Sequence, residues 1–210
     1  ETPMQSLCTM TVGGDAAEIR GFTNIQIQSA VERVAVLGGG VVELSAGVFH
    51  MADALHLRSN VRVKGCGAET VLRKNPMKKS VLTTLVGYGH DDLPVAEPDL
   101  FEVGEGVFVS SSKTGGFLDT TGTLVRREGN TWFNSRTANM DYSNVEGGCV
   151  RTVFPLVDAV DIERASVEDL LLDGRAEEND RINGCRGAAF YAYRSRRVMA
   201  RRIVARDFHG

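Results

Sequence analysis

The sequence has few of the features that mark several common classes of protein. No apolar run approaches the roughly 18 residues that a membrane-spanning helix needs. The formal net charge is −3, which predicts no general affinity for nucleic acid or for anionic membranes. Proline occurs only 5 times in 210 residues, whereas glycine occurs 23 times, a balance typical of tight turns between short strands. With 42% hydrophobic and 24% charged residues, the chain is typical of a globular protein.

The cysteines lack the spacing of a metal site. Cys8, Cys66, Cys149 and Cys185 lie far apart in the chain. We expect isolated, unpaired thiols, with a disulfide as the alternative. The cysteines therefore leave the cellular compartment open.

A repeat is present near the C-terminal end. Residues 165–173 and 198–206 align at a constant offset of 33. Small or apolar residues coincide at the first, third, sixth and eighth places, and charged residues at the fourth, fifth and ninth. Omitting residues 175–184, which overlap the acidic loop at residues 173–180, shortens the offset to 23, a plausible length for one coil of a three-sided solenoid. Such self-similarity indicates a stacked-repeat architecture.

The N-terminal part of the chain predicts one helix followed by short strands. Thr23 and Gln26 have the spacing of a capping box, and apolar residues follow at helical spacing until three glycines begin at Gly38. We therefore expect a helix over residues 24–37. The period then changes to two, which predicts strands at 41–44, 48–51, 54–57, 61–64 and 70–72. No Asn-Gly hairpin joins them, which argues against an antiparallel meander.

Two of these segments resemble a known family. The Gly38-Gly39-Gly40 strand followed by the Ser45-Ala46-Gly47 turn resembles the opening of right-handed parallel β-helix proteins of the pectate-lyase-like superfamily, although Ser45 replaces the usual proline. A strand ending in Gly65-Cys66-Gly67 is similar to the next signature. The resemblance covers about residues 20–75 and 156–210. It implies an all-β, right-handed parallel β-helix whose N-terminal end is capped by the helix.

The middle of the chain has a different pattern. Alternating residues at 101–109, 121–127, 131–133 and 148–154 predict strands, with a tight turn at 128–130 and a loop at 87–98. Such strands describe a small antiparallel β-barrel. We therefore predict three parts: residues 1–76 as the cap and first coils, 77–155 as an inserted barrel domain, and 156–210 as further coils.

An arginine cluster near the C-terminal end has two interpretations. It could form a basic groove for an anionic polysaccharide. The repeat favours a charge ladder instead, because its offset aligns five arginines with five acids. In order, Arg194, Arg196, Arg201, Arg202 and Arg206 align with Asp161, Glu163, Glu168, Asp169 and Asp173. Each pair would lie on adjacent coils about 4.8 Å apart.

Two tyrosines are the candidate substrate-binding residues. If Phe190 and Ala192 face inward, Tyr191 and Tyr193 project outward on one face of a strand. Resemblance to the polygalacturonase-like branch places this strand in the sheet that lines the substrate groove. The tyrosines could stack on sugar rings there, supported by Arg186. Packing against a loop or the inserted domain is the alternative.

His209 is the candidate catalytic residue. In the hydrolase branch that the chain resembles, acids and a histidine cluster where coils turn into the groove sheet, and His209 occupies such a corner. A paired-carboxylate site cannot be assigned, and a structural role for His209 is the alternative. His50, His56 and His90 show no partner pattern.

The acidic loop at residues 173–180 raises the question of a metal. Clustered carboxylates could hold Ca²⁺, which is the candidate cofactor. The spacing lacks the alternation of a dedicated calcium loop, so a solvated loop is the favoured interpretation. No residue is assigned as a metal ligand.

The resemblance implies a function on carbohydrates. We expect a secreted, cell-surface or periplasmic protein that cleaves an extracellular, acidic polysaccharide as a lyase or glycoside hydrolase. A noncatalytic β-helix adhesin or tailspike-like protein is the alternative. The chain begins at Glu1 and stops after a strand-like run, so we expect a fragment of a longer protein. Its open C-terminal coil would then favour self-association.

Overall fold

The computed structural model describes residues 8–114, 118–181 and 185–209. Contacts divide the chain into two compact units. The first unit consists of Glu1–Asn75, Leu156–Arg175 and Ala189–Phe208. The second consists of Pro76–Pro155, Ala176–Ala188 and His209–Gly210.

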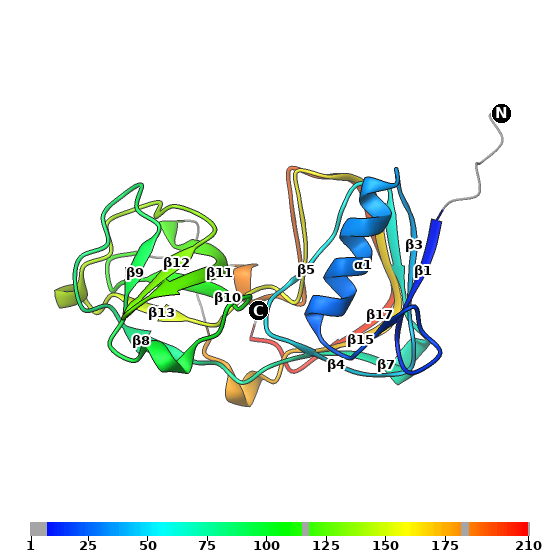
Figure 1. Ribbon diagram of the computed structural model, residues 1–210, viewed down its shortest axis with the longest axis horizontal. Helices are drawn as coiled ribbons and strands as arrows, with labels where there is room; N and C mark the ends of the chain where they lie inside the picture. The colour runs from blue at the N-terminus through cyan, green and yellow to red at the C-terminus, as the bar shows by residue number, and fades with distance from the viewer. Residues whose placement is uncertain (1–7, 115–117, 182–184, 210) are drawn as a thin grey trace. The chain divides into compact units, whose positions relative to one another are not determined.

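The first unit is a three-sided solenoid of parallel strands (Figure 1). Side one contains β1 (Cys8–Gly13), β3 (Gly40–Leu44), β6 (Val61–Lys64) and the first parts of β15 (Glu163–Asp173) and β17 (Arg196–Arg206). Side two contains β4 (Gly47–Met51), β7 (Thr70–Lys74) and the second parts of β15 and β17. Side three contains β5 (Leu55–His56), β14 (Val157–Val160) and β16 (Phe190–Tyr193). The short β2 (Ile19–Arg20) pairs with β1. This topology is that of a parallel β-helix.

Strands β15 and β17 pair at the offset of the sequence repeat. Ala165 is opposite Val198, and Asp173 is opposite Arg206, which confirms the predicted repeat. Both strands bend from side one to side two at residues in the left-handed conformation, Asp169 with φ 56° and Arg202 with φ 51°. Residues other than glycine rarely adopt this backbone conformation, because it brings the Cβ atom close to the following carbonyl oxygen. The stack therefore repeats the same backbone bend on successive coils.

The offset also pairs charges between coils. Arg194 Nε lies 2.6 Å from Asp161 Oδ1, and Arg206 Nη2 lies 2.9 Å from Asp173 Oδ2. Arg202 forms an ion pair with Asp169 as well. In the register, Arg196 is opposite Glu163 and Arg201 is opposite Glu168. The predicted coil-to-coil charge ladder is confirmed, so these arginines face acids rather than forming an unmatched basic groove.

Helix α1 (Asn24–Val36) begins at a capping box. Ile25 N donates to Thr23 Oγ1 at 3.3 Å, and Thr23 N donates to Gln26 Oε1 at 3.2 Å. Gln28 then binds the backbone of β5, because its Nε2 donates to His56 O and its Oε1 accepts from His56 N, both at 3.0 Å. A side chain of the helix thus provides hydrogen-bond partners for the backbone N–H and C=O of His56 at the edge of side three. Its apolar face is buried, through Ile27, Ala30, Val31 and Val34.

The second unit is built on a six-stranded antiparallel sheet. Its strands, in sheet order, are β8 (Lys79–Val81), β13 (Cys149–Arg151), β10 (Gly106–Ser110), β11 (Thr120–Glu128), β12 (Thr131–Asn134) and β9 (Asp92–Pro94). Beyond β8 and β9 the two edges join, because Thr83 N donates to Pro94 O and Ala96 N donates to Val81 O. The sheet therefore closes on itself. Residues 87–98, expected to be a loop, supply the closing strand β9, whose three residues are too short to show a period.

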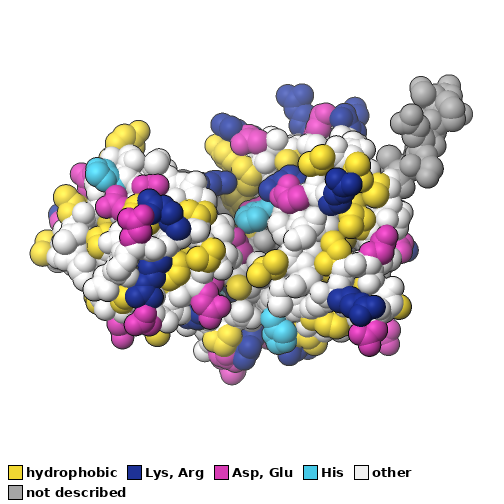
Figure 2. All heavy atoms as spheres, viewed as in Figure 1, with side chains coloured by type: hydrophobic (Ala, Val, Ile, Leu, Met, Phe, Trp, Pro, Cys, Tyr) yellow, Lys and Arg dark blue, Asp and Glu magenta, His cyan; other side chains and the backbone are white. Residues whose placement is uncertain are grey.

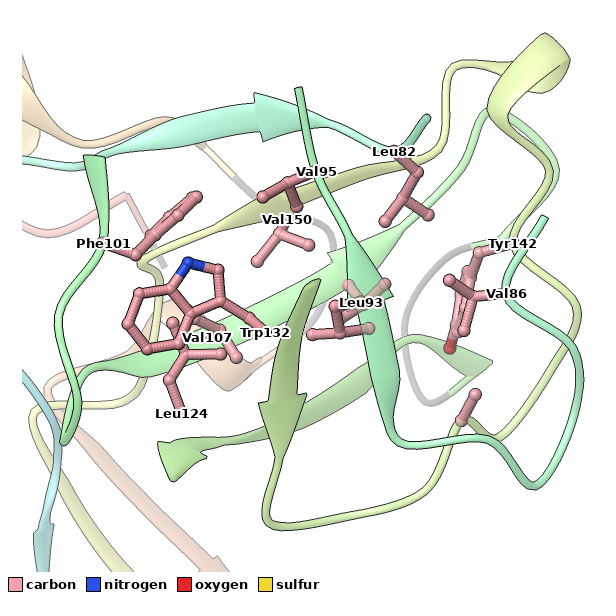
Figure 3. Close-up of a cluster of buried hydrophobic side chains, with 12 residues drawn as sticks. Leu82, Val86, Leu93, Val95, Phe101, Val107, Leu124, Trp132, Tyr142 and Val150 are labelled. Carbon is pink, nitrogen blue, oxygen red and sulfur yellow. The ribbon is translucent and has the colours of Figure 1, made fainter. Parts of the chain in front are cut away.

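Buried side chains fill the interior of the closed sheet (Figure 3). Trp132 and Phe101 lie at one end of the cluster, and Tyr142 and Val86 lie at the other. Trp132 Nε1 donates to Pro98 O at 2.9 Å, so the indole nitrogen is satisfied although the ring is buried. The short helix η2 (Pro98–Leu100) carries that carbonyl.

Two long segments interrupt the solenoid, and both leave it at the corner between side two and side three. We call each of them an excursion. Residues 76–155 connect β7 on side two to β14 on side three. Residues 176–188, which include η5 (Ala176–Glu178) and η6 (Cys185–Gly187), connect β15 to β16 in the same way. Because β7 pairs with β15 and β14 pairs with β16, the second excursion starts and ends one coil beyond the first. The described parts of the chain also contain two short helices, η1 (Gly67–Glu69) and η4 (Asn144–Glu146), and isolated bridges such as Leu82–Val95.

Two glycines of the run that leads into β3 provide a test of coil-to-coil packing. A Cβ on Gly40 would meet Cys8 O at 2.0 Å, whereas a Cβ on Gly38 would meet nothing within 4 Å. Both have positive φ, 153° and 95°. We expect Gly40→Ala to lower the free energy of unfolding by about 3 kcal/mol or more and Gly38→Ala by about 1–2 kcal/mol, since only the first adds a clash to backbone strain. Urea denaturation of both variants would measure this, and equal losses would contradict it.

Candidate functional site

Three side chains form a row across the strands of side three. His56 on β5 is opposite Asp158 on β14, which is opposite Tyr191 on β16. Leu55, which precedes His56 on β5, and Val157, which precedes Asp158 on β14, are buried in the core. Because side chains alternate along a strand, the three row residues project from the other face. We call His56, Asp158 and Tyr191 the side-three row.

His56 is held between two carboxylates. Its Nδ1 lies 2.9 Å from both carboxylate oxygens of Asp158, and its Nε2 lies 3.5 Å from Asp53 Oδ2. Asp53 is fixed in turn, since its Oδ1 accepts from Ala54 N at 2.7 Å. The His56 side chain is 31% exposed and that of Asp158 is 16% exposed. The arrangement presents part of an acid–imidazole pair to solvent.

The two acids determine the charge of His56. Burial by itself lowers the pKa of His56, but hydrogen bonds and charges from Asp158 and Asp53 outweigh burial and raise the pKa to about 10. His56 is therefore an imidazolium at neutral pH, with an N–H on each ring nitrogen. Neither nitrogen has a lone pair with which to accept a proton from a substrate. His56 acts as a fixed cation that orients Asp158.

Tyr191 and Tyr193, which lie next to this pair, have nearly parallel rings. Their ring centroids are 6.4 Å apart, with an angle of 7° between the ring planes. Tyr193 is 46% exposed. The guanidinium of Arg194 lies 5.4 Å from the centroid of the Tyr193 ring. The structure thus brings the two tyrosines together on side three, and their role in binding a substrate stays a prediction.

Arg186 has partners within the second unit. Its Nη1 donates to Thr121 Oγ1 at 2.8 Å. Arg186 and Arg151 also favour the charged form of Asp119, although burial outweighs them and raises the pKa of that carboxyl. Asp119 is buried in the second unit, so Arg186 contributes to a polar cluster there. Its predicted support of the tyrosines stays a prediction.

His209 also contacts residues of the second unit. Its Nε2 lies 2.7 Å from Ala176 O and 2.8 Å from Asn179 O. Both partners are carbonyl acceptors, so this nitrogen carries a proton and donates it. The contacts tie His209 to the loop that contains η5. Its predicted catalytic role stays a prediction.

The acidic loop and the cysteines show no metal-binding arrangement in the part of the chain that is described. No group of three or more His, Cys, Asp or Glu residues in residues 8–114, 118–181 and 185–209 is placed to hold a metal ion. Two acids of the loop form ion pairs, Asp173 with Arg206 and Asp180 with Arg151. The thiols of Cys8, Cys66 and Cys149 are free, as predicted, and the side chain of Cys185 lies outside the described residues.

Charges of both signs are interspersed on the visible face of the molecule. Figure 2 shows basic and acidic side chains alternating over each unit without gathering into one basic area. No helix in the described parts of the chain is long and apolar enough to cross a membrane.

Sequence reasoning missed His56. Its partner Asp158 follows much later in the chain, and most of that separation is the excursion at residues 76–155. The signal that could have found the pair is the alignment of Leu55-His56 with Val157-Asp158 after the excursion is omitted. Of the other histidines, His90 Nδ1 lies 3.0 Å from Asp92 Oδ1 in an exposed position. That pair belongs to the second unit and is separate from the side-three row.

The His56 cluster predicts a dependence of stability on pH. The pKa of His56 is about 10 in the folded state and 6.5 in the absence of structure. Its contribution to stability is therefore complete below about pH 6.5 and is lost as pH rises toward 10. We expect His56→Gln to lower the free energy of unfolding by about 1–2 kcal/mol at pH 6, allowing for partial exposure, and by much less at pH 10.

Urea denaturation of both proteins at pH 6, 8 and 10 would measure this difference. Buried Lys74 has the opposite effect, because desolvation lowers its pKa to about 8 and stability rises as it loses its proton. Lys74 is present in both proteins, so its effect cancels in the difference. A difference that stays constant with pH would contradict the assigned charge of His56.

Comparison with known proteins gives a likeness in fold. No family model matches the chain, and no curated protein matches it. The A-module of a mannuronan C-5 epimerase from Azotobacter vinelandii matches with a TM-score of 0.45 and 16% identity, over 89% of this chain and 34% of that chain. An exopolygalacturonase from Thermotoga maritima matches with a TM-score of 0.41 and 16% identity, over 88% of this chain and 38% of that chain.

A phage protein has a similar level of likeness. The tailspike of Pseudomonas phage phi297 matches with a TM-score of 0.37 and 17% identity, over 86% of this chain and 31% of that chain. The chain therefore spans about a third of the length of these three proteins. Such low identities say nothing of chemistry, and the fold assignment rests on the strand topology. The predicted resemblance to right-handed parallel β-helix proteins is confirmed.

Proposed function

We propose that the outer face of side three binds a polysaccharide and that the protein is carbohydrate-active. The observation that carries this proposal is the stacked pair of Tyr191 and Tyr193 beside the acid–imidazole pair of Asp158 and His56. The apolar face of a sugar ring packs on an aromatic ring, while its hydroxyl groups need hydrogen-bond partners at the edges. The side-three row offers both kinds of contact on one surface.

The rigidity of the platform supports the proposal. Each residue of the row lies on a strand whose backbone is paired with an adjacent coil. The row crosses three coils, which corresponds to about 10 Å at the usual spacing between strands. A site built on sheet strands holds its side chains more firmly than one built on loops, so little ordering is needed when a sugar chain binds.

We infer that the bound chain is cleaved, by lyase or glycoside hydrolase chemistry. Asp158 is the partly exposed acid of the row, and a carboxylate beside a bound sugar can transfer a proton or stabilise positive charge. His56 would serve as its positioning residue, because the imidazolium contacts both carboxylate oxygens. Asp53 is buried on the other side of the ring and supports His56.

A noncatalytic binding protein, similar to an adhesin or a tailspike, is the second candidate. The observation that favours it is the mutual engagement of His56 and Asp158, which neutralises both groups in the ground state. The row would then supply contacts and no proton transfer. The names of the epimerase, exopolygalacturonase and tailspike agree with either candidate, and neither rests on them.

The proposal extends to the organisation of the protein. We propose that α1 caps the first coil, that residues 77–155 act as an inserted barrel domain, and that the protein works outside the cell or on its surface. Self-association through β17 belongs to the same proposal, because β17 pairs only with β15 among the described strands. An unpaired strand edge is a template for pairing with another chain.

Substitution of the tyrosines tests the binding surface. We expect Tyr191→Ala and Tyr193→Ala each to weaken binding to a recognised polysaccharide by about tenfold, since an aromatic contact contributes about 0.5–1.5 kcal/mol beyond its buried area. Affinity electrophoresis over a panel of neutral and acidic polysaccharides would find the ligand, and calorimetry would measure the affinities. The control is Tyr88→Ala, which removes a tyrosine that is 75% exposed in the second unit. Equal losses in all three variants would argue against side three.

Activity assays on the same panel test cleavage. A reducing-sugar assay detects hydrolysis, and ultraviolet absorbance detects the unsaturated uronate that a lyase forms. We expect Asp158→Asn to lower the rate about 10²-fold or more, the usual contribution of a positioned acid or base. Glu43→Gln, which removes an exposed acid from side one, should leave the rate unchanged. Binding without activity in either assay would establish the noncatalytic candidate.

A further inference from the structure

We infer that Gln28 of α1 is a positioning residue for the side-three row, because its side-chain amide completes the hydrogen bonding of the His56 backbone. Helix α1 thereby takes the place of a further strand at the outer edge of β5. The inference rests on the proposed function only in what it implies for binding of a polysaccharide. The hydrogen bonds and the position of the His56 ring can be tested without a ligand.

Strand β5 is the edge strand of the sheet on side three. Among the described strands, β14 is its one neighbour in that sheet. On this side, Leu55 N donates to Leu156 O at 3.0 Å, and Leu57 N donates to Asp158 O at 2.9 Å. Backbone groups of alternate residues point to opposite edges of a strand, so the N–H and C=O of His56 face away from β14. An edge of this kind leaves backbone groups that need other partners.

The side chain of Gln28 supplies both partners. Its Nε2 donates to His56 O and its Oε1 accepts from His56 N, both at 3.0 Å. A carboxamide has the same donor and acceptor as a peptide group, so one side chain matches what a neighbouring strand would present. One helical turn earlier, Asn24 Oδ1 accepts from Ala52 N at 3.2 Å. Two amide side chains of α1 therefore follow the chain between β4 and β5.

The orientation of the Gln28 amide is itself determined. Its Nε2 also donates to Glu32 Oε1 at 2.8 Å. Both neighbours of this nitrogen, His56 O and the Glu32 carboxylate, can only accept, so the nitrogen must lie on this side of the amide. Glu32 is held by Arg58, whose Nε donates to Glu32 Oε2 at 3.1 Å and whose Nη1 donates to Leu57 O at 3.2 Å. The chain of contacts thus begins and ends on β5.

The backbone of His56 in turn positions its ring. Nδ1 lies 2.9 Å from both carboxylate oxygens of Asp158, which is opposite Tyr191 in the register. Hydrogen bonds weaken steeply with distance and angle, so a shift of the edge of β5 would weaken the contact between the ring and Asp158. Gln28 therefore acts on the side-three row through His56.

Amide hydrogen exchange, followed by NMR, tests these hydrogen bonds. In the unaltered protein, the His56 amide should be protected although it lies on a strand edge. We expect Gln28→Ala to speed exchange of the His56 amide about tenfold or more, whereas the Leu57 amide, which donates to β14, should change less than about threefold. An unprotected His56 amide in the unaltered protein would overturn the inference, and so would equal acceleration of both amides in the variant.

The matched control is Ser29→Ala. Ser29 is the exposed neighbour of Gln28, and its Oγ donates to Ile25 O within the helix. This substitution should leave exchange of both the His56 and the Leu57 amide unchanged. If Ser29→Ala accelerated the His56 amide as much as Gln28→Ala does, the effect would come from the stability of the helix and the inference would be wrong.

The ring of His56 reports whether Gln28 has a positioning role. Burial lowers the pKa of His56, and the hydrogen bond with Asp158 is the largest of the effects that raise it, followed by that with Asp53. We expect Gln28→Ala to lower the pKa of His56 by about one unit, because the contact with Asp158 is loosened. Long-range ¹H–¹⁵N NMR spectra of the ring nitrogens over a pH series would measure this. An unchanged pKa would restrict Gln28 to a role in stability and overturn the inference.

Ligand binding separates the inference from the proposed function. On a polysaccharide that the panel identifies, Gln28→Ala should weaken binding about threefold or more, and Ser29→Ala should leave it unchanged. If no polysaccharide binds, the proposed function fails, while the exchange and pKa measurements still decide the role of Gln28 toward His56. Unchanged binding in a Gln28→Ala protein whose His56 ring has shifted would overturn the role of Gln28 at the binding surface.

Discussion

The first unit depends on the register of hydrogen bonds between parallel strands of successive coils. Paired strand residues of a coil lie over the residues that occupy the same place in the coil before it. This constraint stacks apolar side chains inside, left-handed residues at the bends and charged side chains outside. It also places Asp158 beside His56, although a whole excursion separates them in the chain. The excursion at residues 76–155 leaves the register undisturbed because it departs and returns at one corner.

The same stacking has different consequences on different sides. Toward the C-terminal end, arginines of one coil meet acids of the previous one, as in Arg206 with Asp173, and the ion pairs cancel most of the charge. On side three, one imidazolium meets two carboxylates, and the next coil adds Tyr191 and Tyr193. Side three therefore presents an aromatic pair beside an acid–imidazole pair. That combination can pack on a sugar ring and form hydrogen bonds with its hydroxyl groups.

Features that depend on neighbouring residues could be predicted from the sequence. Thr23 and Gln26 contact each other across one helical turn, so their spacing alone indicates the capping box. The offset of the repeat indicated which arginines face which acids, because adjacent coils of similar length stack in one register. The outward pair of tyrosines follows from alternation within a single strand. Short strands such as β9 could not be predicted, since so few residues show no period.

The amino-acid sequence by itself determined the repeat and the alternation within strands, because these depend on the length of a coil and on local periodicity. Only the tertiary structure decided that His56 meets Asp158 and Asp53, and that His209 and Arg186 have partners in the second unit. Contacts of this kind depend on which coil follows an insertion and on where a loop returns to the fold. The number of residues between the two partners in the sequence does not reveal either of these.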